Sequence, residues 1–262
     1  MDLELAGKTA LVTGSNRGTG LIIARQLANE GVRVILHSLE AGDAQDAAKN
    51  IENASAVEGD ITHDEGAEQV AQQLADLDLQ PDILVNNYGT AVPGTWSSLT
   101  TENWLDVYQK NTLSAVRMVN LVIPHMRQQK AGRIVNLGTI GSTRPNSRMP
   151  HYYASKGAMA NLTVSLAKEL GGTGITVNLV SPGLIRTPEV ETHYLAKAKK
   201  SGWGETWEAA ESQITDHYNP NLIGRIATRE EVANIVTFLC SAAASFVTAQ
   251  NIRVDGGAVD IV

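Results

Sequence analysis

Tyr152 and Lys156 lie four residues apart in the segment YYASK, at the start of a pattern typical of a helix. Residues four apart lie one turn apart on the same helix face, so the phenol and the ammonium would be neighbours. A phenol has a pKa of about 10 and is a poor base at neutral pH, but a nearby ammonium stabilises phenolate and lowers that pKa. Such a tyrosine could exchange a proton with a carbonyl or alcohol oxygen. Because this spacing is common by chance, its meaning depends on its context.

Three glycines, Gly14, Gly18 and Gly20, form a second candidate site in the segment GSNRGTG. Small residues allow a tight turn and let the backbone approach a diphosphate, which the amides and dipole of a helix start would hold. The segment follows a β-branched run and precedes a helical pattern, and this position predicts a dinucleotide site. It is not a Walker A loop, because no Gly-Lys-Ser/Thr sequence ends it.

The next strand-like run ends in HSLE, at residues 37–40, and bears on the type of dinucleotide. An acid at this strand end would accept hydrogen bonds from the adenosine ribose, whereas a 2′-phosphate favours a cation. Ser38 occupies the position expected for the acid, and Arg17 lies in the glycine turn, so the pattern favours NADP(H). Two alternatives stay open: a shift of two residues would place Glu40 at the ribose, and Arg17 could be a solvated turn residue.

The elements that must position these residues alternate along the chain. Continuous β-branched runs, typical of strands buried on both faces of a parallel sheet, cover residues 8–13, 32–37, 83–86, 133–137 and 175–180. Helical patterns cover residues 18–30, 63–75, 101–128 and 152–170. This order predicts an α/β fold, a single domain over residues 1–262 built on a doubly wound parallel sheet. Ligands of such sheets bind at the carboxyl ends of the strands.

Composition narrows the classes of partner. The 262 residues are 43% hydrophobic and carry a formal charge of −7, so the acidic surface argues against nucleic acid as a main partner. One cysteine excludes an internal disulfide and a multi-cysteine metal cluster, and we expect no metal. No apolar run reaches about 18 residues, and the N-terminus is acidic where a signal peptide would be basic. We expect a cytoplasmic protein with a small-molecule partner and no membrane contact.

The sequence resembles the short-chain dehydrogenase/reductase family over nearly its whole length. The resemblance is carried by TGSNRGTG at residues 13–20, NNYG at 86–89, the 139–156 segment, SPG at 181–183 and VDGG at 254–257, together with Asp60, Asn111 and Thr187. It implies a Rossmann-like fold with helices on both faces of the sheet, a nicotinamide cofactor, and a homotetramer or homodimer. The chain resembles in particular the ketoreductases of the 3-oxoacyl-carrier-protein type. The apolar residues 259–262 fit a subunit contact.

The resemblance implies four catalytic residues. Tyr152 would be the general acid/base, and Lys156 would bind the nicotinamide ribose hydroxyls and lower the pKa of the tyrosine. Asn111 would help to hold a water in a proton relay behind Lys156. The family's usual serine is replaced by Thr139, whose hydroxyl can still donate to a substrate oxygen. Ser142 is a nearby hydroxyl that could substitute for it.

The expected cofactor contacts lie in the glycine turn and at the carboxyl ends of the strands. They are Gly14, Ser15, Asn16, Arg17, Gly18, Thr19, Gly20, His37, Ser38, Asp60, Ile61, Asn87, Tyr88, Gly89, Tyr152, Lys156, Pro182, Gly183, Ile185 and Thr187. The resemblance implies that Asp60 and Ile61 flank the adenine and that Ile185 and Thr187 contact the nicotinamide carboxamide. Tyr88 replaces the family's usual alanine, and we expect its ring to pack beside the cofactor.

Residues 188–220 break the alternation and are predicted to form a lid over the strand ends. Trp203 and Trp207 lie four apart, on one face of any helix there, and either pin that helix to the body or line the lid. Arg144 and Arg148 precede the Tyr–Lys pair and could recognise an acidic substrate group, or could be surface loop residues. The predicted substrate contacts are Thr139, Ser142, Arg144, Arg148, Tyr152, Trp203 and Trp207.

These patterns together predict an NADP(H)-preferring oxidoreductase that interconverts a ketone and a secondary alcohol. Three alternatives remain: an NAD-dependent alcohol or sugar dehydrogenase, a catalytically silent nucleotide-sensing module, and an epimerase or dehydratase that uses its cofactor transiently. The intact set of Asn111, Tyr152 and Lys156 argues against a silent module. The short segment after Thr187 argues against the epimerases and dehydratases, which usually have a longer C-terminal substrate domain.

Overall fold

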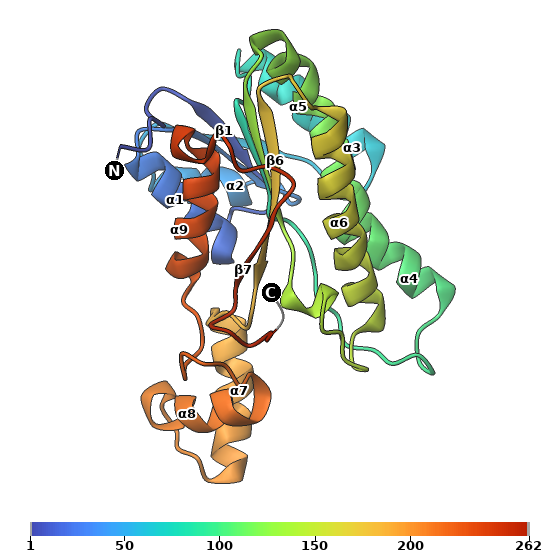
Figure 1. Ribbon diagram of the computed structural model, residues 1–262, viewed down its shortest axis with the longest axis vertical. Helices are drawn as coiled ribbons and strands as arrows, with labels where there is room; N and C mark the ends of the chain where they lie inside the picture. Colours follow the sequence, from blue (N-terminus) through green and yellow to red (C-terminus); the bar gives the residue numbers. More distant parts are fainter. Residues whose placement is uncertain (1, 261–262) are drawn as a thin grey trace.

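A parallel sheet forms the centre of the computed structural model, which describes residues 2–260 (Figure 1). Its strands are β1 (Thr9–Val12), β2 (Arg33–Ser38), β3 (Ala54–Glu58), β4 (Ile83–Asn86), β5 (Gly132–Leu137), β6 (Ile175–Pro182) and β7 (Asn251–Val254). Their order in the sheet is β3-β2-β1-β4-β5-β6-β7. The chain therefore builds outward from β1 in one direction and then, from β4 onward, in the other. The crevice of a doubly wound sheet lies where this reversal occurs, at the carboxyl ends of β1 and β4.

Helices cover both faces of the sheet. They are α1 (Gly18–Asn29), α2 (Asp43–Ala48), α3 (Asp64–Asp76), α4 (Thr101–Tyr108), α5 (Ser114–Gln129), α6 (Pro150–Glu169), α7 (Pro188–Ser201), α8 (Trp207–Tyr218) and α9 (Arg229–Cys240). Successive residues of β1 enter different cores: Ala10 and Val12 pack with α1 and α9, and Leu11 packs with α3 and α5. Because both faces are buried, these strands read as continuous apolar runs.

The predicted α/β class and the parallel sheet are confirmed, and all five predicted runs are strands. Strands β3 and β7 have no continuous apolar run in the sequence, because neither is fully buried. Only Val57 of β3 is buried, and β7 is an edge strand with partly exposed residues. The helical pattern predicted over residues 101–128 is confirmed as one continuous helical segment, in which a π-helical turn at Gln109–Leu113 joins α4 to α5. π-Turns inside helices are frequent at functional sites.

Residues 188–220 fold into α7 and α8, which project beyond the carboxyl ends of the strands (Figure 1). The prediction that both tryptophans share a helix face is wrong: Trp203 lies after α7, and Trp207 is the first residue of α8. Trp207 is 2% exposed in a small core of this segment, and the Arg186 guanidinium lies 4.8 Å from its ring centre. Trp203 packs on His217, with 4.5 Å between the ring centres. Trp207 therefore stabilises the lid from within.

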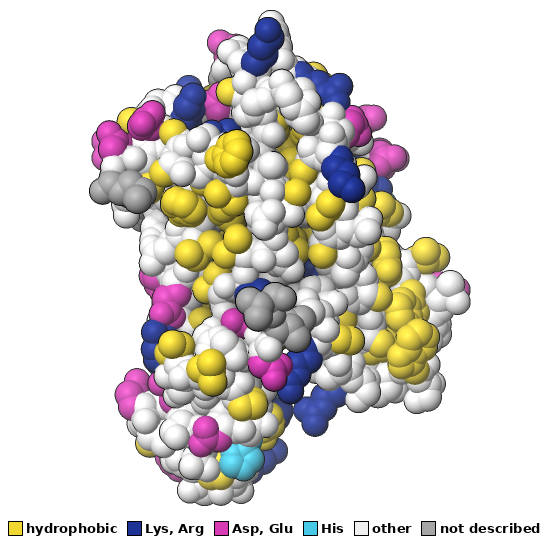
Figure 2. Space-filling view, viewed as in Figure 1, with side chains coloured by type: hydrophobic (Ala, Val, Ile, Leu, Met, Phe, Trp, Pro, Cys, Tyr) yellow, Lys and Arg dark blue, Asp and Glu magenta, His cyan; other side chains and the backbone are white. Residues whose placement is uncertain are grey.

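Apolar side chains gather on the surface over α4 and the segment before it (Figure 2). Trp96 and Leu105 are exposed, and the rings of Trp96 and Trp104 lie 5.0 Å apart. Within residues 2–260, no helix combines the length and the apolar character that crossing a membrane requires. The predicted subunit-contact residues Ile261 and Val262 lie outside the described part of the chain.

The absence of a side chain at Gly20 allows the start of α1 to pack closely against Asn87 and the glycine turn. A Cβ at this position would lie 2.4 Å from Asn87 Nδ2 and 2.6 Å from the carbonyl oxygen of Gly14. We therefore expect Gly20→Ala to lower the free energy of unfolding by about 1–3 kcal/mol through overpacking, measured by denaturant titration. The control is Gly157→Ala in α6, whose added Cβ meets no described atom within 4 Å and should be neutral or stabilising. Equal effects of the two substitutions would contradict this account.

Candidate active site

The glycine turn connects β1 to α1. Gly14 has a φ of +59°, and a Cβ there would lie 3.1 Å from the Tyr88 Cα, so both conformation and packing require glycine. Ser15 Oγ donates to the Val12 carbonyl oxygen at 2.7 Å and is therefore directed into the fold. Arg17 precedes α1, and no side chain of the described residues caps this helix. The first amides of α1 thus keep their capacity to bind an anion.

His37 supports this turn from behind. Its Nδ1 accepts a hydrogen bond from the Gly14 amide at 3.1 Å, and its Nε2 lies 3.0 Å from the Gly59 carbonyl oxygen. Because a carbonyl can only accept, Nε2 carries the proton and the ring is neutral. Burial lowers the pKa of His37 to about 4. The prediction that His37 contacts the cofactor is wrong for its side chain, which is fully buried between the turn and β3.

A cleft opens at the carboxyl ends of β1, β4, β5 and β6. It is lined by Thr19, Asn87, Gly89, Thr90, Ala91, Leu137, Gly138, Tyr152, Lys156, Pro182 and Ile185. The structure thus brings together the glycine turn, the NNYG segment and the Tyr–Lys pair, as the sequence predicted. Thr90, Ala91, Leu137 and Gly138 were missed, although their positions directly after β4 and at the end of β5 could have indicated them. The described residues contain no group of three or more His, Cys, Asp or Glu able to hold a metal ion.

Tyr152 and Lys156 lie on the first turns of α6. Lys156 is 4% exposed, and its Nζ donates to the Leu137 carbonyl oxygen at 2.8 Å. Burial lowers the pKa of Lys156 to about 8. Burial also raises the pKa of Tyr152 to about 12, while a hydrogen bond with Thr139 acts in the opposite direction. The net pKa of Tyr152 thus lies above its ordinary value, because burial is the largest effect. A lowering of this pKa by Lys156 stays a prediction.

Thr139 ends the turn after β5 and lies beside Tyr152. Its Oγ1 accepts a hydrogen bond from the Gly141 amide at 3.2 Å, which leaves the hydroxyl hydrogen to donate elsewhere. Ser142 Oγ donates to the Thr139 carbonyl oxygen at 2.7 Å. Ser142 thus stabilises the turn and, like Thr139, lies outside the residues that line the cleft. Of the two predicted hydroxyls, Thr139 is the one that forms a hydrogen bond with Tyr152.

The two loop arginines are exposed and differ in their contacts. Arg144 Nη1 donates to the Ala258 carbonyl oxygen at 2.9 Å, which ties this loop to the C-terminal segment. Arg148 lies near α6 and the lid, since its charge lowers the pKa of both Tyr153 and Tyr194, against the larger effect of burial. Arg148 therefore remains a candidate for substrate recognition, and Arg144 has a structural contact.

Asn111 lies in the π-turn and is completely buried. Its Oδ1 accepts from the Thr90 amide at 2.8 Å, and its Nδ2 donates to the Thr90 carbonyl oxygen at 2.9 Å. Both the oxygen and the nitrogen of the Asn111 side-chain amide are thus hydrogen-bonded to the backbone of Thr90. A Cβ on Gly89 would lie 2.4 Å from Asn111 Oδ1 and 3.2 Å from Lys156 Nζ, so the chain passes directly beside both groups. Any role of Asn111 in holding a water would fall to its backbone.

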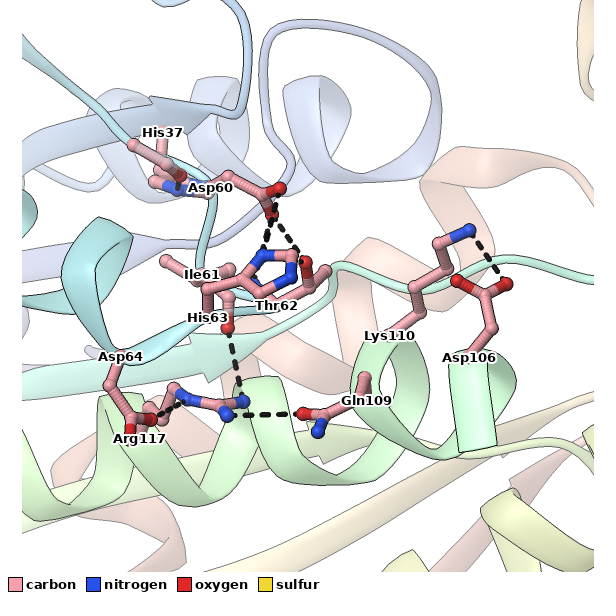
Figure 3. A network of polar contacts seen from close by, with 11 residues as sticks. His37, Asp60, Ile61, Thr62, His63, Asp64, Asp106, Gln109, Lys110 and Arg117 are labelled. Atoms are coloured by element: carbon pink, nitrogen blue, oxygen red, sulfur yellow. Dashed lines mark hydrogen bonds and ion pairs between the residues drawn. The ribbon is translucent and has the colours of Figure 1, made fainter. Parts of the chain in front are cut away.

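Asp60 and Ile61 follow β3 at the predicted adenine end of the crevice (Figure 3). Asp60 Oδ1 accepts from the amide and the hydroxyl of Thr62, at 3.0 Å and 2.7 Å. Burial acts to raise the pKa of Asp60, but these hydrogen bonds and nearby His63 hold it below its ordinary value. The Ile61 side chain is 1% exposed in the core, so only its backbone can face a ligand.

Arg117 connects this adenine-end segment to the π-turn (Figure 3). Its Nε contacts Asp64, and its Nη2 donates to Gln109 Oε1 at 3.0 Å. Because Asp64 begins α3 and Gln109 begins the π-turn, one partly buried guanidinium links these two segments. No local pattern of the sequence indicates Arg117, because its partners Asp64 and Gln109 are 53 and 8 residues away along the chain.

The end of β2 carries Ser38, and the acidic residue Glu40 follows two residues later. Ser38 Oγ donates to the Glu40 carbonyl oxygen at 2.8 Å and accepts from the Ala44 amide at 3.0 Å, so it shapes this turn. Glu40 is exposed. Arg17 is also exposed and lies 3.6 Å from Glu189 in the first turn of α7. The glycine turn and the first turn of α7 therefore lie close together.

Some of the remaining residues predicted to contact the cofactor line the cleft, and others lie outside it. Pro182 and Ile185 line the cleft, whereas Gly183 faces a separate hollow beside β7. Thr187 Oγ1 accepts from the Val190 amide at 3.3 Å and caps α7. Asn16 Nδ2 donates to Asp43 at 3.1 Å, outside the cleft. Several motif residues therefore stabilise the loops around the crevice, and only some of the motif residues line the cleft itself.

Comparison with known proteins agrees with this geometry. The family model described as enoyl-(acyl carrier protein) reductase matches residues 14–259. The 3-oxoacyl-(acyl-carrier-protein) reductase FabG of Pseudomonas aeruginosa is 34% identical over 260 residues, covering 97% of this chain and 98% of the relative. The uncharacterized oxidoreductase YvaG of Bacillus subtilis is 34% identical over 262 residues, covering 99% and 98%. L-Sorbose reductase from Gluconobacter frateurii, complexed with NADPH and L-sorbose, has a TM-score of 0.92 at 31% identity and 100% coverage of both chains.

The chain belongs to the short-chain dehydrogenase/reductase family. It is an NAD(P)-dependent oxidoreductase of that family, as its motifs predicted. The structural likeness to L-sorbose reductase extends over the whole of both chains.

Protonation of His37 should destabilise the fold. The folded protein holds this ring with a pKa of about 4, below the ordinary 6.5, so the unfolded chain takes up the proton first as the pH falls. We expect His37 to contribute about 3 kcal/mol of stability that is present above pH 6.5 and lost on acidification to pH 4. Urea unfolding across this range should show a steeper decline for the wild type than for His37→Gln. His193→Gln, at an exposed histidine, is the control and should show the same decline of unfolding free energy with falling pH as the wild type. If His37→Gln also declined as steeply as the wild type, His37 would not be the group responsible.

Proposed function

We propose that this chain is an NADP(H)-preferring oxidoreductase that interconverts a ketone and a secondary alcohol, with Tyr152 as the general acid/base. The observation that carries the proposal is the composition of the cleft, where Tyr152 and Lys156 face Thr19 in the uncapped first turn of α1. A group able to transfer a proton and a site able to bind a diphosphate therefore share one cavity.

The residues of the cleft have distinct roles in the reductive direction. A bound nicotinamide supplies the hydride. Tyr152, whose pKa is about 12, is protonated at neutral pH and can donate its proton to the substrate oxygen as negative charge develops there. The Thr139 hydroxyl donates to the same oxygen, and the two hydroxyls stabilise the oxyanion. Lys156 has one N–H on Leu137, and its other N–H groups are available to ribose hydroxyls.

The preference for NADP(H) rests on the adenosine end of the crevice. Ser38 stands where an acid would favour NAD(H), and the exposed guanidinium of Arg17 can pair with a 2′-phosphate. Solved relatives carry the same cofactor: L-sorbose reductase was crystallised with NADPH, and Pseudomonas aeruginosa RhlG, with a TM-score of 0.85 at 30% identity, with NADP. The names of the relatives include L-sorbose reductase and 3-oxoacyl-(acyl-carrier-protein) reductase, so a substrate panel should contain L-sorbose and a 3-oxoacyl thioester.

We further propose that the protein forms a homotetramer or homodimer, as the family resemblance implies. Several large apolar side chains are exposed on the single chain, among them Trp96, Leu222 and Phe246. Exposed apolar surface of this kind is typical of subunit contacts.

Tyr152→Phe tests the assigned proton transfer. Loss of the hydroxyl should lower kcat by about 10²–10⁴-fold in carbonyl reduction with NADPH. Binding of NADPH, measured as a rise in Tm, should persist, because the ring still fills the same space. Tyr153→Phe is the matched control, since the Tyr153 hydroxyl accepts a hydrogen bond from Asn146 and should be dispensable. Normal turnover by Tyr152→Phe would refute the role of Tyr152.

Arg17→Ala tests the cofactor preference. Loss of a charged partner for the 2′-phosphate should raise KM for NADPH by about tenfold or more and leave KM for NADH nearly unchanged. Arg33→Ala, at an exposed arginine that begins β2 at the opposite end of the strand, should change neither value. Equal changes with both cofactors in Arg17→Ala would argue against a 2′-phosphate contact.

A further inference from the structure

An ion pair connects the glycine turn to the lid. Arg17 Nη1 lies 3.6 Å from Glu189 Oε1, and the two residues belong to segments that are far apart along the chain. Both side chains are open to solvent, with exposed fractions of 79% for Arg17 and 65% for Glu189, so a dissolved ligand can reach either of them. The distance is longer than a hydrogen bond, so the N–H groups of the guanidinium remain able to turn to a closer acceptor.

Two acidic side chains of the first turn of α7 have different partners. Glu191 is held within the lid, because Arg186 Nε and Nη2 donate to its two carboxylate oxygens at 2.9 Å and 3.0 Å. Glu189 is paired instead with the glycine turn through Arg17. A hydrogen bond with its own backbone amide is the largest effect on the pKa of Glu189, and the net result is a pKa below the ordinary value. Glu189 therefore carries a negative charge at neutral pH.

We propose that Glu189 is a specificity-determining residue, which competes with the 2′-phosphate of NADP(H) for the Arg17 guanidinium and thereby lowers the affinity for this cofactor. The inference rests on the proposed function, because it assumes that Arg17 binds the 2′-phosphate. A phosphate can accept two parallel N–H bonds from one guanidinium, which makes a stronger contact than a loose, exposed ion pair. The phosphate therefore displaces Glu189, and breaking the ion pair weakens the net binding. NAD(H) has no 2′-phosphate and leaves the pair intact.

The test removes the charge of Glu189 and compares ligands with and without a 2′-phosphate. In calorimetric titrations at low ionic strength, Glu189→Gln should lower Kd for NADP⁺ and for 2′,5′-ADP by about two- to fivefold, the range that an exposed ion pair supplies. Kd for NAD⁺ and for ADP should stay unchanged. In the Arg17→Ala background, Glu189→Gln should have no further effect on NADP⁺ binding, because the group for which the two anions compete is gone.

Glu205→Gln is the matched control. Glu205 also belongs to the lid and is 72% exposed, but it pairs with Lys199, at 3.0 Å, so its substitution makes the same change of charge and should alter no Kd. Unchanged NADP⁺ affinity in Glu189→Gln would overturn the inference. An equal gain with NAD⁺, or a gain that persists in the Arg17→Ala background, would also overturn it, since either result indicates general repulsion of the cofactor. Wild-type NADP⁺ affinity in Arg17→Ala would instead overturn the proposed 2′-phosphate contact, and the inference with it.

Discussion

The burial of Lys156 is the constraint on which the arrangement of the site depends. An ammonium that is 4% exposed must be held by hydrogen bonds, and the Leu137 carbonyl oxygen at the end of β5 supplies one of them. The chain after β4 has to pass close by, which only a glycine at position 89 permits, and Asn111 then binds the backbone of Thr90 on the other side. One buried cation thereby determines how the ends of β4 and β5, the π-turn and α6 meet.

The same burial determines the protonation states of the site. Withdrawal from water favours the neutral form of any group, so it lowers the pKa of Lys156 to about 8 and raises that of Tyr152 to about 12. The protein by itself therefore presents a protonated phenol, the form that reduction of a carbonyl requires. The spacing of Tyr152 and Lys156 alone predicts a lowered pKa for Tyr152, because a nearby ammonium stabilises phenolate. Removal of the phenol from water acts in the opposite direction, and the sequence spacing does not show it.

The adenosine end of the crevice is organised from beneath by residues that never reach it. His37 supports the glycine turn through its neutral ring, and Ser15 closes the turn onto β1. Arg117 links the segment after β3 to the π-turn that contains Asn111 (Figure 3). These polar groups connect segments that are distant along the chain and meet at the crevice.

The sequence by itself determined the fold class and the location of the crevice, because buried parallel strands and a helix-start glycine turn leave local patterns. The spacing of Tyr152 and Lys156 indicated a pair on one helix face, and the family resemblance pointed to Thr139. It did not reveal β7, the π-turn, Arg117 or Thr90, since edge burial and contacts between distant segments have no local period. It also misplaced His37 and assigned Trp203 and Trp207 to one helix, because motif position does not specify which way a side chain points. Only the tertiary structure decided which polar groups face the cleft and which support it, since burial and hydrogen-bond partners arise when distant segments pack together.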